Sequence, residues 1–169
     1  SAGEPPVEFL YNEMGPQISG VTSIGTNSLV VVTKTQTVDL VDHSSLADLD
    51  LIALADPNLA PAGVYSREFL VNTGLWSSLE DRFILAADVR AALNYVKSGN
   101  VDAAIVYMTD GLTEPGLLIW DIIPRDSYSP ISYPAAVIGG GNRHRGANIF
   151  VEFLVSPEIA DIFHTYGFR

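Results

Sequence analysis

The chain has 169 residues, of which 47% are hydrophobic and 17% charged, with 20 acidic against 9 basic side chains. This length allows one ordinary domain or two small lobes, and the apolar content excludes a disordered chain. A formal net charge of −11 makes nucleic acid and anionic membrane surfaces poor partners. A membrane-spanning helix needs about 18 consecutive apolar residues, and no run in the sequence is that long. The absence of cysteine excludes disulfides and thiolate chemistry.

Strand and helix patterns alternate along the chain. Short apolar runs predict strands over residues 29–32, 51–55, 83–85, 103–107, 117–120 and 133–138. Helical patterns cover residues 61–72, 89–99, 146–155 and 157–166. Because strands that alternate with helices are joined by crossover connections, we predict an α/β fold with a mainly parallel, doubly wound sheet.

Two of these helices carry clear start and stop signals. Pro61 suits the first turn of one helix, and Gly74 can end it in a left-handed conformation. Asp88 is expected to cap the next helix, which ends near Gly99. The positions expected to face inward are Ala62, Tyr65, Phe69 and Val71 in the first helix, and Val89, Ala92, Leu93 and Val96 in the second.

The two ends of the chain are less regular. Glu8–Tyr11 could form a helix turn, but glycine and proline between residues 15 and 20 interrupt the sequence around it. This stretch is expected to belong to something larger. Near the other end, Ser156 and Gly167 are expected to cap and stop the last helix.

Two helix starts follow strands and could bind an anion. They lie at residues 61–63 and 88–90, directly after predicted strands. In an open α/β sheet, ligands bind at the carboxyl ends of the strands. Unpaired amides and the positive end of the helix dipole meet there, so Ala62 and Val89 could donate N–H groups, and Tyr107 could add its hydroxyl. From this pattern alone, ordinary helix starts remain the simpler interpretation, because every helix has an N-terminus.

Other sequence features give weaker indications of chemistry. Gly139–Gly141 resembles a phosphate-binding loop but lacks the Gly-Lys-Ser/Thr ending. The neighbouring basic cluster Arg143–Arg145 is expected to be solvated. The histidines lack metal-ligand spacing and are expected at surface or capping positions: His43, His144 and His164.

The acidic residues also have structural explanations. Asp56 and Asp110 follow strands, but turn formation accounts for both better than paired acid–base catalysis does. Ser66 has no nucleophile elbow around it. Asp88 would repel an anion unless its carboxylate turns toward its own helix amides. We find no catalytic constellation and predict that the protein is not an enzyme.

Several blocks, in order over about residues 24–168, resemble the second lobe and closing segment of the periplasmic molybdate-binding proteins of ABC transporters. These blocks are Ala55-Asp56-Pro57-Asn58-Leu59-Ala60-Pro61-Ala62-Gly63-Val64-Tyr65, Gly74-Leu75-Trp76, Ala87-Asp88-Val89-Arg90-Ala91-Ala92-Leu93, Ile105-Val106-Tyr107-Met108-Thr109-Asp110, Tyr133-Pro134-Ala135-Ala136-Val137 and Leu154–Phe168. The resemblance implies a type II periplasmic-binding-protein fold, with one complete lobe and a remnant of the other. It places a tail of lobe I at residues 1–26, lobe II at 27–133 and the return to lobe I at 134–169.

The resemblance also implies a ligand set. The family's lobe-II ligands fall on the Ala62 and Val89 amides and the Tyr107 hydroxyl, with Gly63 and Asp88 as neighbours. The implied ligand is molybdate or tungstate, between which the sequence does not choose. No cofactor and no other metal are implied. The implied partner is an ABC-transporter permease, and the implied location is periplasmic or extracytoplasmic.

The chain departs from the family near its start. The family's lobe I contributes serine hydroxyls, but Ser19, Ser23 and Ser28 do not match that motif. We therefore expect either a fragment of a longer receptor or a short relative with half a site, whose apolar remnant of lobe I is covered by a partner chain or by self-association. The alternatives are a binding-incompetent assembly module and, less well supported, a phosphate-handling enzyme.

Overall fold

The computed structural model describes residues 18–34, 42–138 and 144–169. The chain forms two compact units. Unit 1 combines Ser1–Asn27 with Pro130–Arg169, and unit 2 is Ser28–Ser129. The expected helix turn at Glu8–Tyr11 lies outside the described residues.

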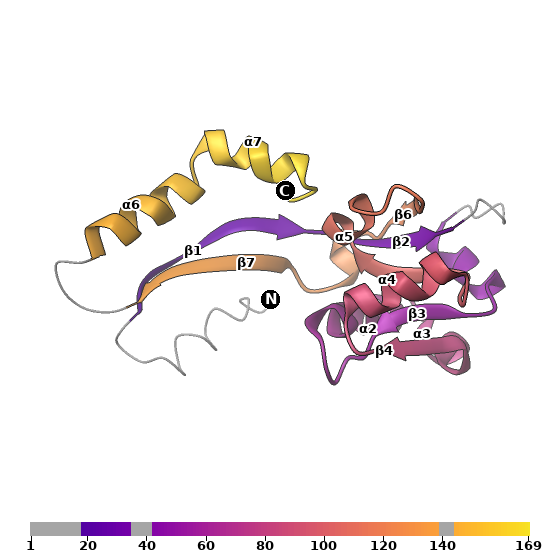
Figure 1. The fold of residues 1–169 in the computed structure, drawn as a ribbon. Coiled ribbons are helices and arrows are strands. Elements are labelled where there is room, and N and C mark those ends of the chain that lie inside the picture. Colours follow the sequence, from indigo (N-terminus) through magenta and orange to yellow (C-terminus); the bar gives the residue numbers. More distant parts are fainter. Residues whose placement is uncertain (1–17, 35–41, 139–143) are drawn as a thin grey trace. The chain divides into compact units, whose positions relative to one another are not determined.

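Unit 2 is built on a five-stranded sheet with the order β4-β3-β5-β2-β6 (Figure 1). β3 pairs in parallel with both β4 and β5, whereas β2 pairs antiparallel with β5 and β6. Four strands therefore point one way and β2 points the other, so the predicted mainly parallel sheet has one reversed strand. The strands are β2 Leu29–Thr33, β3 Ile52–Ala55, β4 Phe83–Ala86, β5 Ala103–Tyr107 and β6 Leu118–Ile122.

The two main helices of unit 2 cover opposite faces of this sheet. Helix α2 (Pro61–Asn72) connects β3 to β4, and α4 (Val89–Ser98) connects β4 to β5. These connections run in opposite directions along the sheet. Because crossover connections between parallel strands are right-handed as a rule, the two helices are expected on different faces. The cluster under α4 accordingly contains Val30, Val32, Ala53, Ala104 and Val106 but no residue of α2. The doubly wound arrangement is confirmed.

The helix boundaries follow the signals in the sequence. Gly74 and Gly99 have φ angles of 77° and 76°, the left-handed conformation expected just beyond each helix. Of the expected inward positions of α2, Ala62 and Phe69 are buried, but Val71 is 53% exposed. The expectation for Val71 was wrong because Leu70, one position earlier, packs inward instead.

Unit 1 pairs two strands and carries two helices. Strand β1 (Ile18–Asn27) pairs antiparallel with β7 (Ile131–Ile138). Helices α6 (His144–Leu154) and α7 (Pro157–Thr165) follow. β1 was not predicted, because glycines and hydroxyl side chains interrupt any alternation of apolar residues along it.

The C-terminal end is tied to β1. Thr26 and Arg169 exchange backbone hydrogen bonds, with N–O distances of 2.7 and 2.9 Å. Gly167 ends the segment after α7 with a φ of 90°, as predicted. Ser156 occupies the N-cap position of α7, as predicted, and its carbonyl accepts hydrogen bonds from the Ile159 and Ala160 N–H groups. Its hydroxyl, however, caps no helix amide and is buried with no hydrogen-bond partner in the described part of the chain.

Several short elements were not predicted, because three to six residues show no helical periodicity. They are η2 His43–Asp48, α3 Trp76–Leu79, η3 Glu80–Arg82, α5 Met108–Leu112 and η4 Arg125–Ser127. No helix within the described ranges is long and apolar enough to cross a membrane.

Candidate functional site

The predicted site residues lie along one edge of the sheet of unit 2. The carboxyl ends of β4, β3 and β5 are neighbours in the sheet, and they lead to Val89, to Ala62 and to Tyr107 respectively. In the sheet, β4 lies on one side of the β3–β5 pair and β6 lies on the other. The chain leads from β3 to β4 and from β5 to β6, so the two connections diverge. This divergence is a topological switch point, the position where open α/β sheets bind ligands.

The N-terminal end of α2 is pressed against the end of β3. A Cβ added to Gly63 would lie 2.2 Å from the Ala55 carbonyl oxygen, so only glycine allows this approach. Ala60 occupies the N-cap position without a side-chain hydrogen bond to the helix. Ala62 is 3% exposed and, among the described residues, its N–H donates no hydrogen bond.

The connection that leads into α2 is held by Asp56. Its Oδ1 accepts hydrogen bonds from the backbone N–H and side-chain amide of Asn58 at 2.8 and 2.9 Å. This confirms the turn interpretation for Asp56. Ser66 is also structural, because its buried hydroxyl donates to the Ala62 carbonyl at 2.7 Å.

The N-terminal end of α4 is capped in a way that leaves its first amide available. The Asp88 carboxylate accepts a hydrogen bond from the Ala91 N–H at 2.8 Å, as the sequence predicted. In the part of the chain that the structure describes, the Val89 N–H donates to no acceptor. The carboxylate that could repel an anion is therefore turned toward its own helix.

Tyr107 is the last residue of β5 and the N-cap residue of α5. It lies opposite Leu29 of β2 and is partly buried. Because Val106 belongs to the cluster under α4, strand alternation places the Tyr107 side chain on the face of α2. Tyr107 and the start of α2 thus share both an edge and a face of the sheet.

Asp110 lies in α5 rather than in the expected turn, and its carbonyl accepts a hydrogen bond from the Thr113 N–H at 3.1 Å. Burial raises the pKa of its carboxyl above 3.8, while Arg90 lowers it and Asp88 raises it further. The first turn of α4 therefore lies close to Asp110. No pattern in the sequence signals this proximity.

The remaining candidates do not form a site. The His43 imidazole lies 4.0 Å from the Asp121 carboxylate and its ring meets Phe69 edge-on. No group of three or more potential metal ligands occurs among the residues described. The glycine run at 139–141 and Arg143 lie outside the described ranges.

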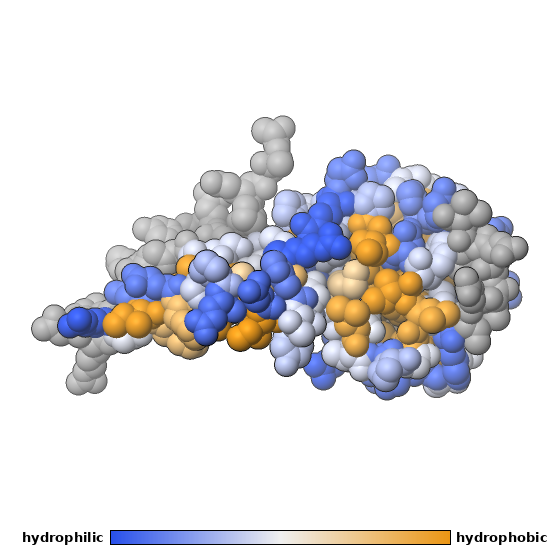
Figure 2. Space-filling view, turned by 90° about the horizontal axis from the view of Figure 1, so that it is seen from above, coloured by the Kyte–Doolittle hydropathy of each residue, from blue (hydrophilic) through white to orange (hydrophobic). Residues whose placement is uncertain are grey.

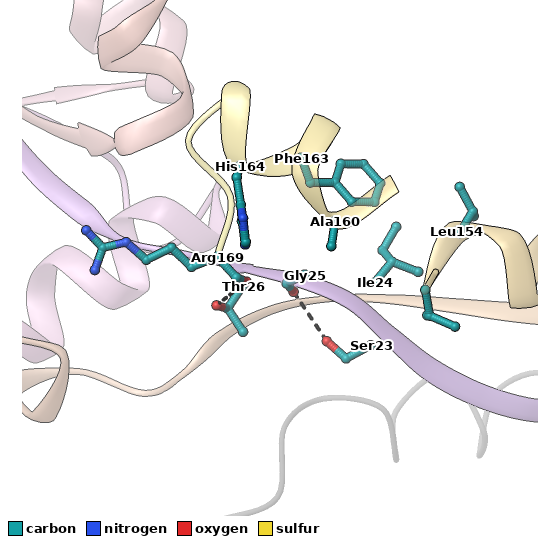
Figure 3. Close-up of a pocket in the computed structure, with 10 residues that line it drawn as sticks. Ser23, Ile24, Gly25, Thr26, Leu154, Ala160, Phe163, His164 and Arg169 are labelled. Carbon is teal, nitrogen blue, oxygen red and sulfur yellow. Dashed lines mark hydrogen bonds between the residues drawn. The ribbon is translucent and has the colours of Figure 1, made fainter. Parts of the chain in front are cut away.

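Unit 1 contains a cavity of about 280 Å³ between β1 and the two C-terminal helices (Figure 3). Ile24, Leu154 and Phe163 provide apolar walls, and His164 and Arg169 lie at one end. No local sequence pattern reveals this cavity, because its lining comes from segments far apart in the chain.

Comparison with known proteins defines the family. The family described as bacterial extracellular solute-binding protein matches residues 11–169. The molybdate-binding protein ModA of Escherichia coli is 36% identical over 149 residues, covering 84% of this chain and 58% of that protein. A lipoprotein of Bacillus subtilis, assigned as an ABC transporter substrate-binding protein, is 37% identical over 145 residues, covering 86% of this chain and 56% of that protein.

A solved structure shows the same fold. A substrate-binding domain assigned to a molybdenum ABC transporter of Clostridium difficile matches with a TM-score of 0.86 and 29% identity, covering 100% of this chain and 74% of that one. The predicted α/β fold of the periplasmic-binding-protein type is confirmed. The chain spans slightly more than half the length of the two sequence relatives. The chain belongs to the bacterial extracellular solute-binding protein family.

Proposed function

We propose that this chain binds a tetrahedral oxyanion of the molybdate and tungstate type, as part of a receptor that serves an ABC transporter. The observation that carries the proposal is the start of α2, which has no side-chain cap and is pressed against β3 at Gly63. The start of α4 and Tyr107 lie along the same sheet edge. The names of the relatives support molybdate as the ligand.

The donors suit a ligand that must be bound and later released. The Ala62 and Val89 amides and the Tyr107 hydroxyl are neutral groups, and two of them lie at the positive ends of helix dipoles. Hydrogen bonds from such groups offset the desolvation of a doubly charged oxyanion. A directly bound lysine or arginine would hold the ligand more strongly and slow its release.

We further propose that unit 2 corresponds to lobe II, with Gly63 and Asp88 as neighbours of the ligand. Each charge-assisted hydrogen bond contributes about 1.5–3 kcal/mol, so three donors alone should bind less tightly than a cleft closed by two lobes. A permease is the proposed protein partner, and the proposed location is periplasmic or extracytoplasmic, as the family description and the relatives' names suggest.

The direct test is a titration of the chain with molybdate, tungstate, sulfate and phosphate by calorimetry, with a thermal melt in each anion. A ligand at 100 times its Kd adds about 2.7 kcal/mol to the free energy of unfolding, which a melt detects easily. We expect heat and a raised Tm with molybdate and tungstate. No response to any of the four anions would contradict the proposal.

A second proposal, an assembly role for unit 1, is favoured by its exposed apolar residues. The large apolar side chains exposed on α6, on α7 and beside them are Ile149, Phe150, Phe153, Val155, Ile162 and Tyr166. Figure 2 shows apolar residues at the surface along this part of the chain. Because monomeric proteins rarely leave such surfaces in water, we propose that this one is covered by self-association.

A further inference from the structure

Arg125 brings a positive charge to the same sheet edge as the proposed oxyanion donors. β6 and β5 are both antiparallel to β2, so β6 also ends at the edge where Tyr107 lies. η4 begins at Arg125, three residues after β6 ends at Ile122. Neither a motif nor a predicted helix start marks Arg125 in the sequence.

The Arg125 side chain reaches back toward β5. Its Nη2 and Nε donate hydrogen bonds to the Ser28 hydroxyl at 3.2 and 3.4 Å. Ser28 is 1% exposed, and its carbonyl accepts a hydrogen bond from the Met108 N–H at 2.8 Å. Met108 directly follows Tyr107, and Ser28 directly precedes β2, the strand next to β5. The guanidinium is therefore bonded to the chain that runs beside the end of β5.

The backbone that carries Arg125 is held in place by α2. The Asn72 side-chain amide donates to the Ser127 carbonyl at 2.9 Å. The Ser129 N–H donates to the Glu68 carboxylate at 2.6 Å. Since α2 also carries Ala62, the same helix positions both a proposed anion donor and the segment that presents the charge.

We propose that Arg125, held by Ser28, is an electrostatic positioning residue of the oxyanion site that speeds capture of the anion and favours dianions over monoanions. The inference rests on the proposed function. With a formal net charge of −11, the chain as a whole repels an approaching anion. A local cation opposes that repulsion, and the hydroxyl of Ser28 orients the guanidinium.

Two acidic residues belong to the segment around Arg125 and to the helix that holds that segment. The neighbouring Asp126 is exposed, and the Glu68 carboxylate is engaged by the Ser129 N–H. Electrostatic attraction scales with the charge of the ligand, so the same guanidinium acts about twice as strongly on a dianion as on a monoanion. Its effect should weaken as salt shortens the screening length.

The test is stopped-flow binding of tungstate at low and at near-physiological salt to the wild type and to Arg125→Gln, Arg125→Lys and Ser28→Ala. The matched control is Arg67→Gln, because Arg67 is an exposed residue of α2 that lies 5.3 Å from the Trp76 ring centroid. It makes the same change in net charge. Thermal melts of each variant establish that it is folded.

We expect Arg125→Gln to lower the association rate about 3- to 10-fold at low salt, with a smaller loss at higher salt. Arg125→Lys should keep most of the rate, and Ser28→Ala should lower affinity while retaining the charge. If the wild type binds tungstate and Arg125→Gln matches Arg67→Gln at both salt concentrations, the inference is overturned. If the wild type binds no oxyanion, the proposed function fails first, and the role of Arg125 fails with it.

Discussion

A Cβ on Gly63 would lie 2.2 Å from the carbonyl oxygen of Ala55, and 2.6 Å from the carbonyl carbon of Asp56. Both neighbours are backbone atoms, which cannot rotate away as a side chain can. Gly63→Ala should therefore push the start of α2 from the end of β3 and lower the free energy of unfolding by about 2–3 kcal/mol. Urea denaturation followed by circular dichroism measures this loss.

Gly116→Ala is the matched control for this change. A Cβ at Gly116 would meet nothing within 4 Å, and its φ is not in the left-handed region. We expect its stability to stay within about 0.5 kcal/mol of the wild type. Equal stability of Gly63→Ala and Gly116→Ala would show that α2 does not depend on this close approach.

Tyr107→Phe tests the phenol at the end of β5. The ring and its packing are retained, while the hydroxyl proposed to donate to the oxyanion is lost. We expect affinity for molybdate to fall about 10-fold, the loss expected for one hydrogen bond to a charged group. The Tm without ligand should change little. Tyr95→Phe, on the exposed side of α4, is the control, and an unchanged Kd in Tyr107→Phe would remove Tyr107 from the site.

The sequence predicted α2, α4 and their ends well, because local chemistry determines them. Pro61 and Gly74 bracket α2, and Asp88 and Gly99 bracket α4, each through the residue's own backbone preference or cap. The sequence therefore showed where each strand ends and the next helix begins. These are the positions of the proposed amide donors.

Features that depend on distant parts of the chain were not predictable. The reversed direction of β2 is set by pairing with β5 and β6, whose paired residues lie at least 70 positions further along the chain. The proximity of Asp110 to Arg90, and of Arg125 to Ser28, arises only when strands from different parts of the chain become neighbours. No local pattern marks such pairs.

Val89→Pro tests the amide at the start of α4. Proline is tolerated at the first helical position, as Pro61 and Pro157 in this chain illustrate, but it removes the N–H donor. We expect affinity for molybdate to fall at least about 10-fold. Val89 also packs against the cluster under α4, so part of any stability loss reflects the side chain.

Val89→Ala separates these two effects, because it loses the same packing and keeps the amide. Calorimetry should give Val89→Ala nearly the wild-type Kd for molybdate, with a stability loss similar to that of the proline variant. If both variants bind with the same Kd, the Val89 amide does not contact the ligand.

Self-association through unit 1 predicts a concentration-dependent particle mass. The aromatic residues Phe150 and Phe153 of α6 are 58% and 45% exposed. Multi-angle light scattering should show a dimer or larger particle for the wild type and a monomer for Phe150→Ser/Phe153→Ser. Leu112→Ser, at an exposed apolar residue of unit 2, is the control and should still associate. A strictly monomeric wild type would contradict the assembly proposal.

Asp110→Asn should stabilise the protein at neutral pH and much less at acidic pH. Burial raises the pKa of the Asp110 carboxyl above 3.8 in the folded state, against the opposing effect of Arg90. At a pH between the pKa of Asp110 in the unfolded chain and its raised pKa in the folded protein, the folded protein binds more protons than the unfolded chain. The stabilisation that comes from protonated Asp110 is therefore complete below the unfolded pKa. It is lost as the pH rises through the folded pKa. At neutral pH the wild type therefore holds an unfavourable charge that asparagine removes.

Urea denaturation from about pH 4 to about pH 7 should show the stability gain of Asp110→Asn growing with pH. Asp81→Asn, at an exposed position away from α4 and α5, controls for the loss of one negative charge. A stability gain for Asp110→Asn that does not change with pH would contradict this assignment.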